Sequence, residues 1–483
     1  MPINTSRMTS YMVTKNHSLA SLSLSLTMQV ITKSSDEEKH VALLAFPFGS
    51  HPFSSLSLLR KLATAAPNIL FSFLNTPNSN HSILSKTKDE DLPHNLKFHD
   101  VTDGVPEGHV PSVREAVYLF LKAMPESLKK GIDLAAAKTG KRITCLLSDG
   151  FFTCAAGIAQ EMNVPWIPIW APLPCSLSAH LYTNLIRQRC GNGSSGKLDF
   201  IPGLSAMHVA DLPEEVLIPA AGDGEESLLS RMLSQMESVL PRASAIIMGS
   251  FEELNPPPLN HDLKSKFKNV LYVGFLSISV PAPPLLPSTS DLTGCLSWLD
   301  RQKWRSVAYV GFGTVAALPQ DELTAIAEAL QTSGIPFLWS LSDNSKDLLP
   351  KGFVEKTRMH GKLVPWTPQS QVLAHASVGV FVTHCGANSV YESIVNGVPL
   401  ICRPFLGDNF MTGRMIEDVW GIGVKVEGGE ITKSWLLKSL ELVLRDEQGR
   451  VMREKVQALK KVVLEAAGRA TQEFNSLVEL ISN

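Results

Sequence analysis

The chain has 483 residues, of which 44% are hydrophobic and 19% are charged, a balance typical of a globular protein with more than one core. Lys and Arg number 44 against 46 Asp and Glu, so the formal net charge is −2. This neutral balance argues against a general electrostatic grip on nucleic acid or on an anionic membrane. The length indicates two or three domains.

The seven cysteines are scattered along the chain, and no two of them are spaced as Cys-x-x-Cys. This pattern supports neither a disulfide framework nor a zinc site, and it fits a reducing compartment better. The apolar runs stay below the roughly 18 residues that a transmembrane helix needs. We therefore expect a cytoplasmic protein without a membrane span and without a bound metal.

Residues 1–38 differ in composition from the rest of the chain. They are rich in Ser and Thr, and residues 1–35 contain no Asp or Glu. This composition is weakly similar to an organelle transit peptide, but a disordered leader is the favoured interpretation, and the run from Ala20 to Thr27 is too polar for a signal-peptide core. A start of translation at Met28 is a further alternative. We predict a disordered leader over residues 1–38.

From residue 39 onward, short apolar runs alternate with amphipathic segments. Val41–Phe46 predicts a buried strand that ends at Pro47, and a turn and a helix over Pro52–Ala66 follow. Ile69–Leu74 predicts the next strand. Further strands are predicted at residues 143–147, 166–170 and 245–248, and helices at 113–130 and 153–162. Strands alternating with helices predict parallel βαβ units, here in a first domain over residues 39–254.

Prolines open and close the stretch 255–292, which therefore predicts an interdomain linker. The alternation resumes in a second domain over residues 293–465. Its strands are predicted at residues 307–310, 337–339, 362–364, 378–382 and 400–402, and its helices at 320–332 and 388–396. The C-terminus is expected to be helical, with residues 466–483 packing back on the first domain. The predicted fold is α/β, with two parallel sheets facing each other across a cleft.

In open parallel sheets, ligands collect beyond the carboxyl ends of the strands, so the loops that follow the strands form the candidate site. The loop after residues 378–382 contains His384, and a helix begins near Asn388 and Ser389. Such a helix start binds anions such as phosphate through its free N–H groups and its dipole. Asn and Ser are also ordinary N-cap residues, so this loop alone leaves both interpretations open.

Two neighbouring loops favour the ligand-binding interpretation. Trp366 follows the preceding strand and suits stacking on a nucleobase, although for this Trp taken alone a core position is the favoured interpretation. Asp408 and Asn409 follow the strand at 400–402 and offer side chains that bind paired hydroxyls, although turn formation also explains them. A stacking ring, an anion site and hydroxyl acceptors on three successive loops predict a nucleotide-sugar site.

The stretch from Trp366 to Asn409 strongly resembles the signature box of plant UDP-sugar-dependent glycosyltransferases that act on secondary metabolites. The resemblance extends over nearly all of residues 40–483, and Phe251–Leu254 and Ser178–Tyr182 resemble the flavonoid 3-O-glycosyltransferase branch. It implies the GT-B fold of two Rossmann-like domains, a UDP-sugar co-substrate and no metal. The family usually has Trp where this chain has Ala387, at a contact made largely by the backbone.

The resemblance also implies roles for individual residues of the donor site. Trp366 stacks on uracil, while Gln369 and Glu392 hold the nucleoside and its ribose hydroxyls. The pyrophosphate is bound around His384, and the transferred sugar faces the Asp408 region. The implied donor-binding residues are Thr314, Trp366, Thr367, Gln369, His384, Asn388, Ser389, Glu392, Asp408, Asn409 and Ala171.

The first domain is expected to supply the catalytic base. His51 lies directly after the first strand, and Asp149 lies at a strand end, where they match the family's catalytic His and its acidic partner. A buried carboxylate bonded to one imidazole nitrogen fixes the tautomer, so that the other nitrogen can take the proton of an acceptor hydroxyl. The expected acceptor pocket contains Phe48, Gly49, Phe152, Trp170 and His180, with the core or a plain helix position as the alternative for the aromatic side chains and His180.

Two positions depart from glucose-transferring members of the family. The last residue of the box is Asn409 rather than Gln, and Ala171 replaces a Thr whose hydroxyl meets the 6-OH of the sugar. A 6-OH without a partner loses a bond that it makes in water, so a 6-deoxy sugar fits Ala171 better. We therefore expect an inverting flavonol 3-O-rhamnosyltransferase that uses UDP-rhamnose, with flavonoid 3-O-glucosyl transfer from UDP-glucose as the alternative.

An NAD-dependent oxidoreductase is a remote alternative. Gly311–Ala316 follows a strand and fits GxGxxA, but the acidic residue expected about 20 positions later is not clearly placed, and Pro319 interrupts the start of the helix. A non-catalytic sugar-nucleotide binder is a further alternative, against which the presence of both His51 and Asp149 argues. We expect a monomer whose partners are a UDP-sugar and a flavonoid, not nucleic acid.

Overall fold

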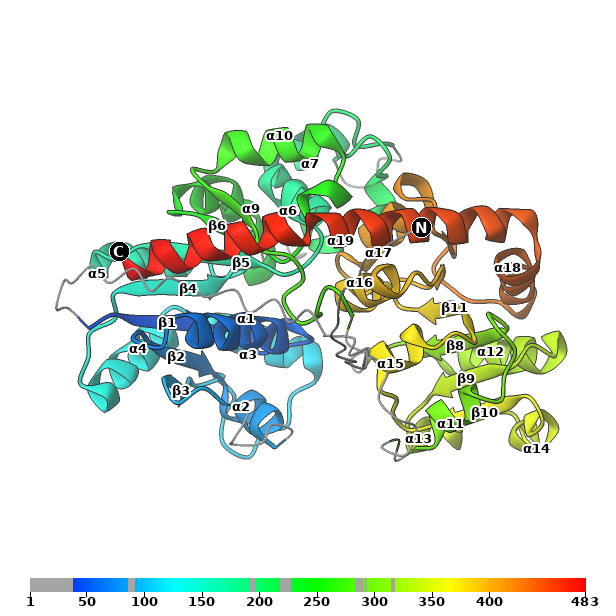
Figure 1. Cartoon of the computed structure of the whole chain (residues 1–483). Coiled ribbons are helices and arrows are strands. Elements are labelled where there is room, and N and C mark those ends of the chain that lie inside the picture. The colour runs from blue at the N-terminus through cyan, green and yellow to red at the C-terminus, as the bar shows by residue number, and fades with distance from the viewer. Residues whose placement is uncertain are drawn as a thin grey trace, which may run out of the picture. The chain divides into compact units, whose positions relative to one another are not determined.

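The computed structural model describes residues 38–85, 92–191, 196–217, 227–282, 291, 293–313 and 318–483. The predictions for residues 1–37 of the leader and for Thr314 lie outside the described residues. Two parallel sheets with helices packed around them organise the described chain (Figure 1). The predicted α/β class is confirmed.

The first sheet has the strand order β3-β2-β1-β4-β5-β6-β7, and its pairings are parallel. Its strands are β1 His40–Leu44, β2 Leu70–Asn75, β3 Leu96–Asp100, β4 Cys145–Asp149, β5 Trp166–Trp170, β6 Ile246–Met248 and β7 Val270–Tyr272. The central strands are buried along their whole length, because helices cover both faces of a parallel sheet. This burial explains why they stand out as continuous apolar runs.

Helices connect the strands of this first half. They are α1 His51–Ala65, α2 Pro77–Leu84, α3 Val113–Ala123, α4 Glu126–Thr139, α5 Cys154–Met162, α6 Pro174–Leu181, α7 Thr183–Cys190, α8 Glu214–Leu217, α9 Leu228–Val239 and α10 Pro257–Lys266. A short 3-10 helix, η2, covers Val209–Asp211. The helix predicted over residues 113–130 is divided in two, because Pro125 cannot continue the hydrogen-bond ladder of α3.

The second sheet has the order β10-β9-β8-β11-β12-β13, again with parallel pairings. Its strands are β8 Val307–Gly311, β9 Phe337–Ser340, β10 Gly361–Val364, β11 Val378–Thr383, β12 Leu400–Cys402 and β13 Gly423–Lys425. The helices of this half are α11 Cys295–Leu299, α12 Gln320–Ser333, α13 Asp343–Lys346, α14 Phe353–Thr357, α15 Gln369–Ala374, α16 Ala387–Asn396, α17 Asn409–Arg414 and α18 Lys433–Arg445.

The stretch predicted as a linker, residues 255–292, is folded over much of its length. It contains α10 and β7, and β7 pairs with β6 as the last strand of the first sheet. Pro257 occupies the first turn of α10, where its missing N–H breaks no helical hydrogen bond. The linker prediction therefore extends too far into the first half, because prolines that begin a helix have the same composition as prolines in a linker.

The chain ends in one long helix, α19 (Glu447–Ser482), drawn as the red ribbon in Figure 1. It packs on α16 and α18 in the second half and on β7 in the first half. Its last residues, Leu477 and Ile481, belong to the same core cluster as Val41 of β1. The helix begins well before the predicted boundary at residue 466 and connects the two halves.

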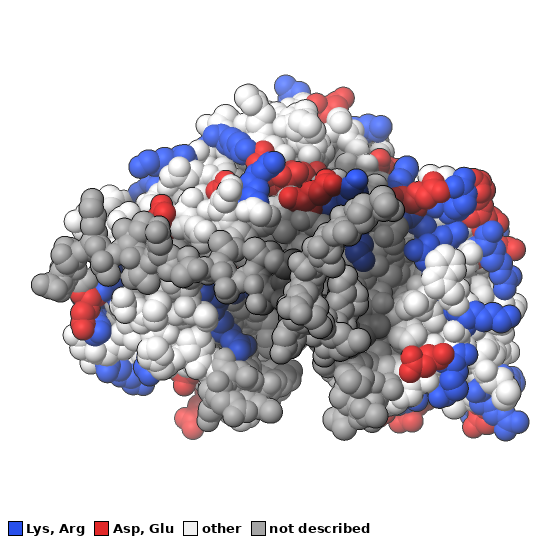
Figure 2. All heavy atoms as spheres, in the orientation of Figure 1, with Lys and Arg blue, Asp and Glu red and all other residues white. Residues whose placement is uncertain are grey.

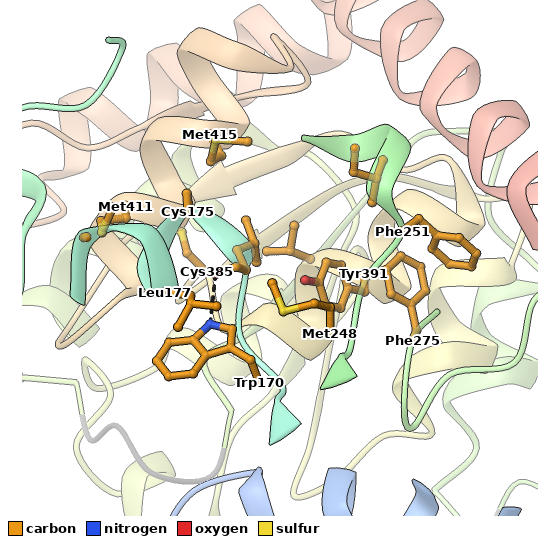
Figure 3. Packing of buried hydrophobic residues seen from close by; sticks show 14 of the residues in the cluster. Trp170, Cys175, Leu177, Met248, Phe251, Phe275, Cys385, Tyr391, Met411 and Met415 are labelled. Atoms are coloured by element: carbon orange, nitrogen blue, oxygen red, sulfur yellow. Dashed lines mark hydrogen bonds between the residues drawn. The ribbon is translucent and has the colours of Figure 1, made fainter. Parts of the chain in front are cut away.

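A hydrophobic cluster continues from the first half into the second (Figure 3). The ring of Tyr391 in α16 stacks on Phe275 with 4.1 Å between centroids, and Met411 and Met415 lie in the same cluster as Leu177 of α6. Each large apolar side chain that is fully buried contributes roughly 1.5–3 kcal/mol. The two halves are therefore held together by a shared apolar core.

Charged side chains of both signs are interspersed on the described part of the face shown in Figure 2. Among the described residues, none of the helices combines the length and apolar character that crossing a bilayer requires.

Candidate active site

A cavity of about 1220 Å³ lies at the carboxyl ends of both sheets. Its lining comes from the loops that follow β1, β8, β10, β11 and β12, so both halves contribute. This is where parallel α/β sheets bind ligands. The predicted residues that line it are Phe48, Gly49, His51, Ala171, Trp366, Thr367, Gln369, His384, Asn388, Ser389, Glu392, Asp408 and Asn409.

His51 and Asp149 form a hydrogen-bonded pair at the cavity. His51 is the first residue of α1, and its Nδ1 lies 2.7 Å from Oδ2 of Asp149, the last residue of β4. The other carboxylate oxygen of Asp149 accepts a hydrogen bond from the backbone N–H of Phe151 at 3.1 Å, which fixes its orientation. With Nδ1–H donated to Asp149, the Nε2 atom of His51 is left as a hydrogen-bond acceptor.

The surroundings of His51 raise its pKa above the usual 6.5. Burial of the ring beside Phe46 and Phe151 lowers the pKa, but the charge and hydrogen bond of Asp149 and the charge of Asp408 more than offset this. The imidazolium is therefore stabilised by one carboxylate from each half. This is the arrangement that a general base needs when it receives a proton during a reaction.

On the opposite side of the cavity, Trp366 presents an indole that is 63% exposed. The residues after it form a buried hydrogen-bond network. The hydroxyl of Thr367 lies 2.7 Å from the hydroxyl of Tyr309, which also donates to Oε1 of Gln369 at 3.1 Å. Trp366 thus stands as an exposed ring on a rigid support, which suits stacking of a planar ligand.

Gln369 connects this network to α16. Its Nε2 donates to Oγ of Ser389 at 3.0 Å and to Oε2 of Glu392 at 2.6 Å, while Ser370 donates to the other oxygen of Glu392. Burial raises the pKa of Glu392, and these two hydrogen bonds partly counteract the shift. Tyr309 and Ser370 were not predicted from the sequence, because Tyr309 belongs to an apolar strand and Ser370 carries no signal of its own.

His384 lies between two glycines. A Cβ atom at Gly386 would come within 2.4 Å of its Nε2 atom, and one at Gly313 within 2.8 Å of its Cε1 atom. Burial lowers the pKa of His384 to about 4, so the ring is neutral near pH 7. A neutral imidazole can donate one hydrogen bond to an anion without adding a charge. Asn388 hydrogen-bonds instead to Ser54 and Ser277 of the first half, at 3.4 and 3.2 Å.

Asp408 and Asn409 lie at the start of α17 and line the cavity. Burial raises the pKa of Asp408, and the charge of His51 lowers it. Asp408 and His51 line the same cavity, and their charges interact. Ala171, directly after β5, lines the same cavity.

Three predicted acceptor residues do not line the cavity. Phe152, Trp170 and His180 are only 1–3% exposed and pack in the core, and Figure 3 shows Trp170 among other buried side chains. The indole of Trp170 donates to the backbone carbonyl of Leu173 at 3.2 Å, and burial lowers the pKa of His180 to about 4. His180 is buried because α6 is buried on all sides, while Trp170 ends the buried strand β5 and Phe152 packs in the same core cluster.

The cavity instead extends over residues that belong to no recognisable sequence motif. They are residues of α2 and of the loop that leads into α3, namely the polar residues Asn78, Ser79, Ser82, Asp103 and His109 and the apolar residues Val105, Val110 and Pro111. Among the residues that the structure describes, no three His, Cys, Asp or Glu side chains are grouped as a metal site would require.

The glycine turn after β8 is described as far as Gly313, and residues 314–316 of the GxGxxA match lie outside the described residues. In a dinucleotide-binding fold, the glycine-rich turn opens directly into a helix whose N-terminus meets the pyrophosphate. Here Gly313 packs against the ring of His384. The described part of this turn gives the oxidoreductase alternative no support.

Comparison with known proteins gives consistent matches. Residues 288–461 match the family model described as UDP-glucoronosyl and UDP-glucosyl transferase. An anthocyanidin 3-O-glucosyltransferase of Vitis vinifera is 46% identical over 453 residues, covering 92% of this chain and 97% of that protein. An anthocyanidin 3-O-galactosyltransferase of Rhododendron delavayi is 48% identical over 467 residues, covering 94% and 99%.

A flavonol 3-O-glucosyltransferase of Actinidia chinensis var. chinensis is 47% identical over 459 residues, covering 92% of this chain and 98% of that protein. The fold matches the crystal structure of a UDP-glucose:anthocyanidin 3-O-glucosyltransferase in complex with UDP, with a TM-score of 0.86 and 46% identity over 93% of this chain and all of that one. The chain therefore belongs to the UDP-glycosyltransferase family and has its GT-B fold.

Proposed function

We propose that this enzyme transfers glucose from UDP-glucose to the 3-hydroxyl of a flavonoid, a flavonol or an anthocyanidin, with inversion at the anomeric carbon. The observation that carries the proposal is the 2.7 Å hydrogen bond between His51 and Asp149 at a cavity that also contains Trp366 and Glu392. The proposed base in the first half and the proposed nucleotide site in the second half line the same cavity. The names of the relatives support a flavonoid acceptor.

The donor proposal departs from the rhamnose expected from Ala171 and Asn409. The relatives described above are named for transfer of glucose or galactose, and the matching crystal structure is of an enzyme named for UDP-glucose. These names favour the glucose alternative over rhamnose. Ala171 lines the cavity but offers only a methyl group, so the hydroxyls of the hexose must find their partners elsewhere, and Asp408 and Asn409 face the same space.

The chemistry that we propose follows from the geometry of the base. The Nε2 atom of His51 takes the proton of the acceptor hydroxyl while the acceptor oxygen attacks C1 of the sugar. The bond from C1 to the UDP oxygen breaks, and UDP leaves with the electron pair. Asp149 stabilises the imidazolium that forms. The free N–H groups at the start of α16 and the neutral ring of His384 can bind the pyrophosphate as its charge grows.

The pH dependence of kcat/KM should reveal this base. Because Asp149 and Asp408 raise the pKa of His51, the neutral, reactive form predominates only above that raised pKa. We expect kcat/KM to fall on the acid side with a midpoint above pH 6.5. In an Asp149→Asn variant, which loses the main stabilising charge, the midpoint should move to lower pH. An acid limb that is identical in both enzymes would contradict the pairing.

A panel of donors and acceptors tests the substrate assignment. UDP-glucose, UDP-galactose and UDP-rhamnose are each offered with a flavonol and an anthocyanidin, and the products are identified by mass and NMR. We expect the highest kcat/KM with UDP-glucose and a β-linked 3-O-glucoside, since inversion converts the α-linked donor. A higher kcat/KM with UDP-rhamnose would overturn the donor proposal, and a retained α-glucoside would overturn the direct displacement.

A further inference from the structure

A buried ionic cluster joins the two halves outside the cavity lining. Asp211 is the last residue of η2 in the first half and is 1% exposed. Its Oδ2 accepts a hydrogen bond from Nε of Arg414 at 2.9 Å, and its Oδ1 accepts from Nη2 of Arg414 at 3.2 Å and from Nζ of Lys425 at 2.9 Å. Arg414 ends α17, and Lys425 ends β13. One carboxylate of the first half therefore holds two separate elements of the second half.

Hydrogen bonds from both halves fix the orientation of the Asp211 carboxylate. The Oδ2 atom of Asp211 also accepts the backbone N–H of His208 at 2.9 Å, which fixes the carboxylate in its own half. Burial raises the pKa of Asp211, but the hydrogen bonds from Arg414 and Lys425 lower it below its usual value, so the group stays ionised. Desolvation offsets much of the attraction in a buried ion pair, whereas a bidentate Arg–carboxylate contact specifies orientation.

Helix α17 links the ionic cluster around Asp211 to the cavity. This helix begins at Asn409, directly after Asp408, and ends at Arg414. At about 1.5 Å per residue, its 6 residues span only about 9 Å, so Arg414 lies within about 9 Å along the helix of the end that adjoins Asp408. A Cβ atom at Gly413 would come within 2.8 Å of Cδ of Lys425, so the helix rests directly on that side chain.

The loop between β12 and α17 is held at its start by an ion pair within the second half. Arg403, just after β12, bonds to Glu322 of α12 with Nε 2.9 Å from Oε2, and both residues belong to the second half. The loop from Pro404 to Asn409 is thus anchored to its own half at one end and to the first half at the other. Met411 of α17 also packs in the apolar cluster shared by the two halves, whereas Asp211 supplies a directional ionic contact from the first half to the end of α17.

We propose that Asp211 is a positioning residue that, through Arg414 and α17, sets the placement of Asp408 and Asn409 opposite His51. This inference rests on the proposed function, because it concerns the geometry of sugar transfer. The shared apolar core already holds the two halves together, so the ionic cluster contributes orientation. We expect an enzyme without Asp211 to fold, but with the loop from Pro404 to Asn409 displaced from His51.

The test compares Asp211→Asn with Asp418→Asn. Asp418 is a matched control, because it pairs with the same guanidinium at 3.0 Å but from within the second half, and its side chain is 43% exposed. We expect Asp211→Asn to lower kcat by about 10–100-fold, as displacements of about 1 Å at a reacting centre do, with little change in the Kd for UDP. The control should retain the kcat of the parent enzyme.

The acid limb of the kcat/KM profile separates positioning from stability. The described charged groups that act on His51 are Asp149 from β4 and Asp408 from the start of α17. If α17 is displaced, the charge of Asp408 acts less on His51, and the midpoint should move to lower pH in Asp211→Asn but not in Asp418→Asn. A role limited to stability would lower the melting temperature without moving this midpoint.

Several outcomes would overturn the proposal. Parent-like kcat and an unshifted acid limb in folded Asp211→Asn would do so. If that variant does not fold, Arg414→Lys repeats the test, because it keeps the charge but loses the bidentate contact. Misfolding of both, with a folded control, would assign the cluster to stability alone. An inactive parent enzyme would instead refute the proposed function, so the two failures are distinguishable.

Discussion

A His51→Ala variant is expected to lose about 10²–10⁴-fold in kcat while it keeps its affinity for UDP, because general base catalysis typically contributes that much. The substitution removes the ring that links Asp149 to the cavity through a 2.7 Å hydrogen bond. The residues predicted to bind the nucleotide, from Trp366 to Glu392, all belong to the second half and are left in place. The loss should therefore appear in turnover at saturating substrates and not in the Kd for UDP measured by calorimetry.

His81→Ala is the matched control for this experiment. His81 is an exposed residue of α2 and is not among the residues that line the cavity. Its kcat should equal that of the parent enzyme. If His51→Ala kept a kcat within a few-fold of the parent while remaining folded, the assignment of His51 as the base would be wrong, and another group would have to take the proton.

Apolar runs predicted the central strands well because these strands are buried on both faces. The predicted strand at residues 166–170 coincides with β5, and the one at 400–402 coincides with β12. Strands β3, β7 and β13 were not predicted. The sequence of β3 mixes polar and apolar residues because it lies at an edge of its sheet and is half exposed. β7 falls in the stretch 255–292 that was predicted as a linker, and β13 has a Gly and a Lys among its three residues.

The part of the cavity lined by the second half was predictable because its residues are close together in the sequence. The loops after β10, β11 and β12 hold Trp366, His384 and Asp408, and parallel strand ends must meet at one edge of the sheet. Pairing of His51 with Asp149 follows from the same rule, because β1 and β4 are neighbours in the first sheet. Such contacts are a consequence of topology, which the alternation of strands and helices already indicates.

The part of the cavity lined by the first half was less predictable. Phe152 and Trp170 were expected in a pocket, yet both are in the core, because aromatic composition does not distinguish a buried ring from a ligand-facing ring. The cluster around Asp211 left no signal in the sequence either, since Asp211 is more than 200 positions from both Arg414 and Lys425. Contacts that form only when the two halves pack together leave no pattern in the sequence and become visible in the folded structure.

Trp366→Ala should weaken UDP binding by about 5–150-fold, because stacking of a base on an aromatic side chain contributes about 1–3 kcal/mol. The indole is 63% exposed, so its removal leaves no cavity in the core and should not lower the melting temperature appreciably. The effect should appear in the Kd for UDP and in the KM for the UDP-sugar. Once the donor is saturating, kcat should change little, since the ring touches the nucleotide and not the reacting carbon.

Trp304→Ala provides a control of the same residue type in the same half. Trp304 is 70% exposed and lies outside the cavity lining, so its loss removes a similar exposed surface without touching the site. Its Kd for UDP should equal that of the parent enzyme, and Trp366→Phe should recover part of the affinity because a smaller ring still stacks. An unchanged Kd in Trp366→Ala would mean that the nucleobase binds elsewhere in the cavity. The network of Gln369 and Glu392 would then have to hold the nucleoside without a stacking partner.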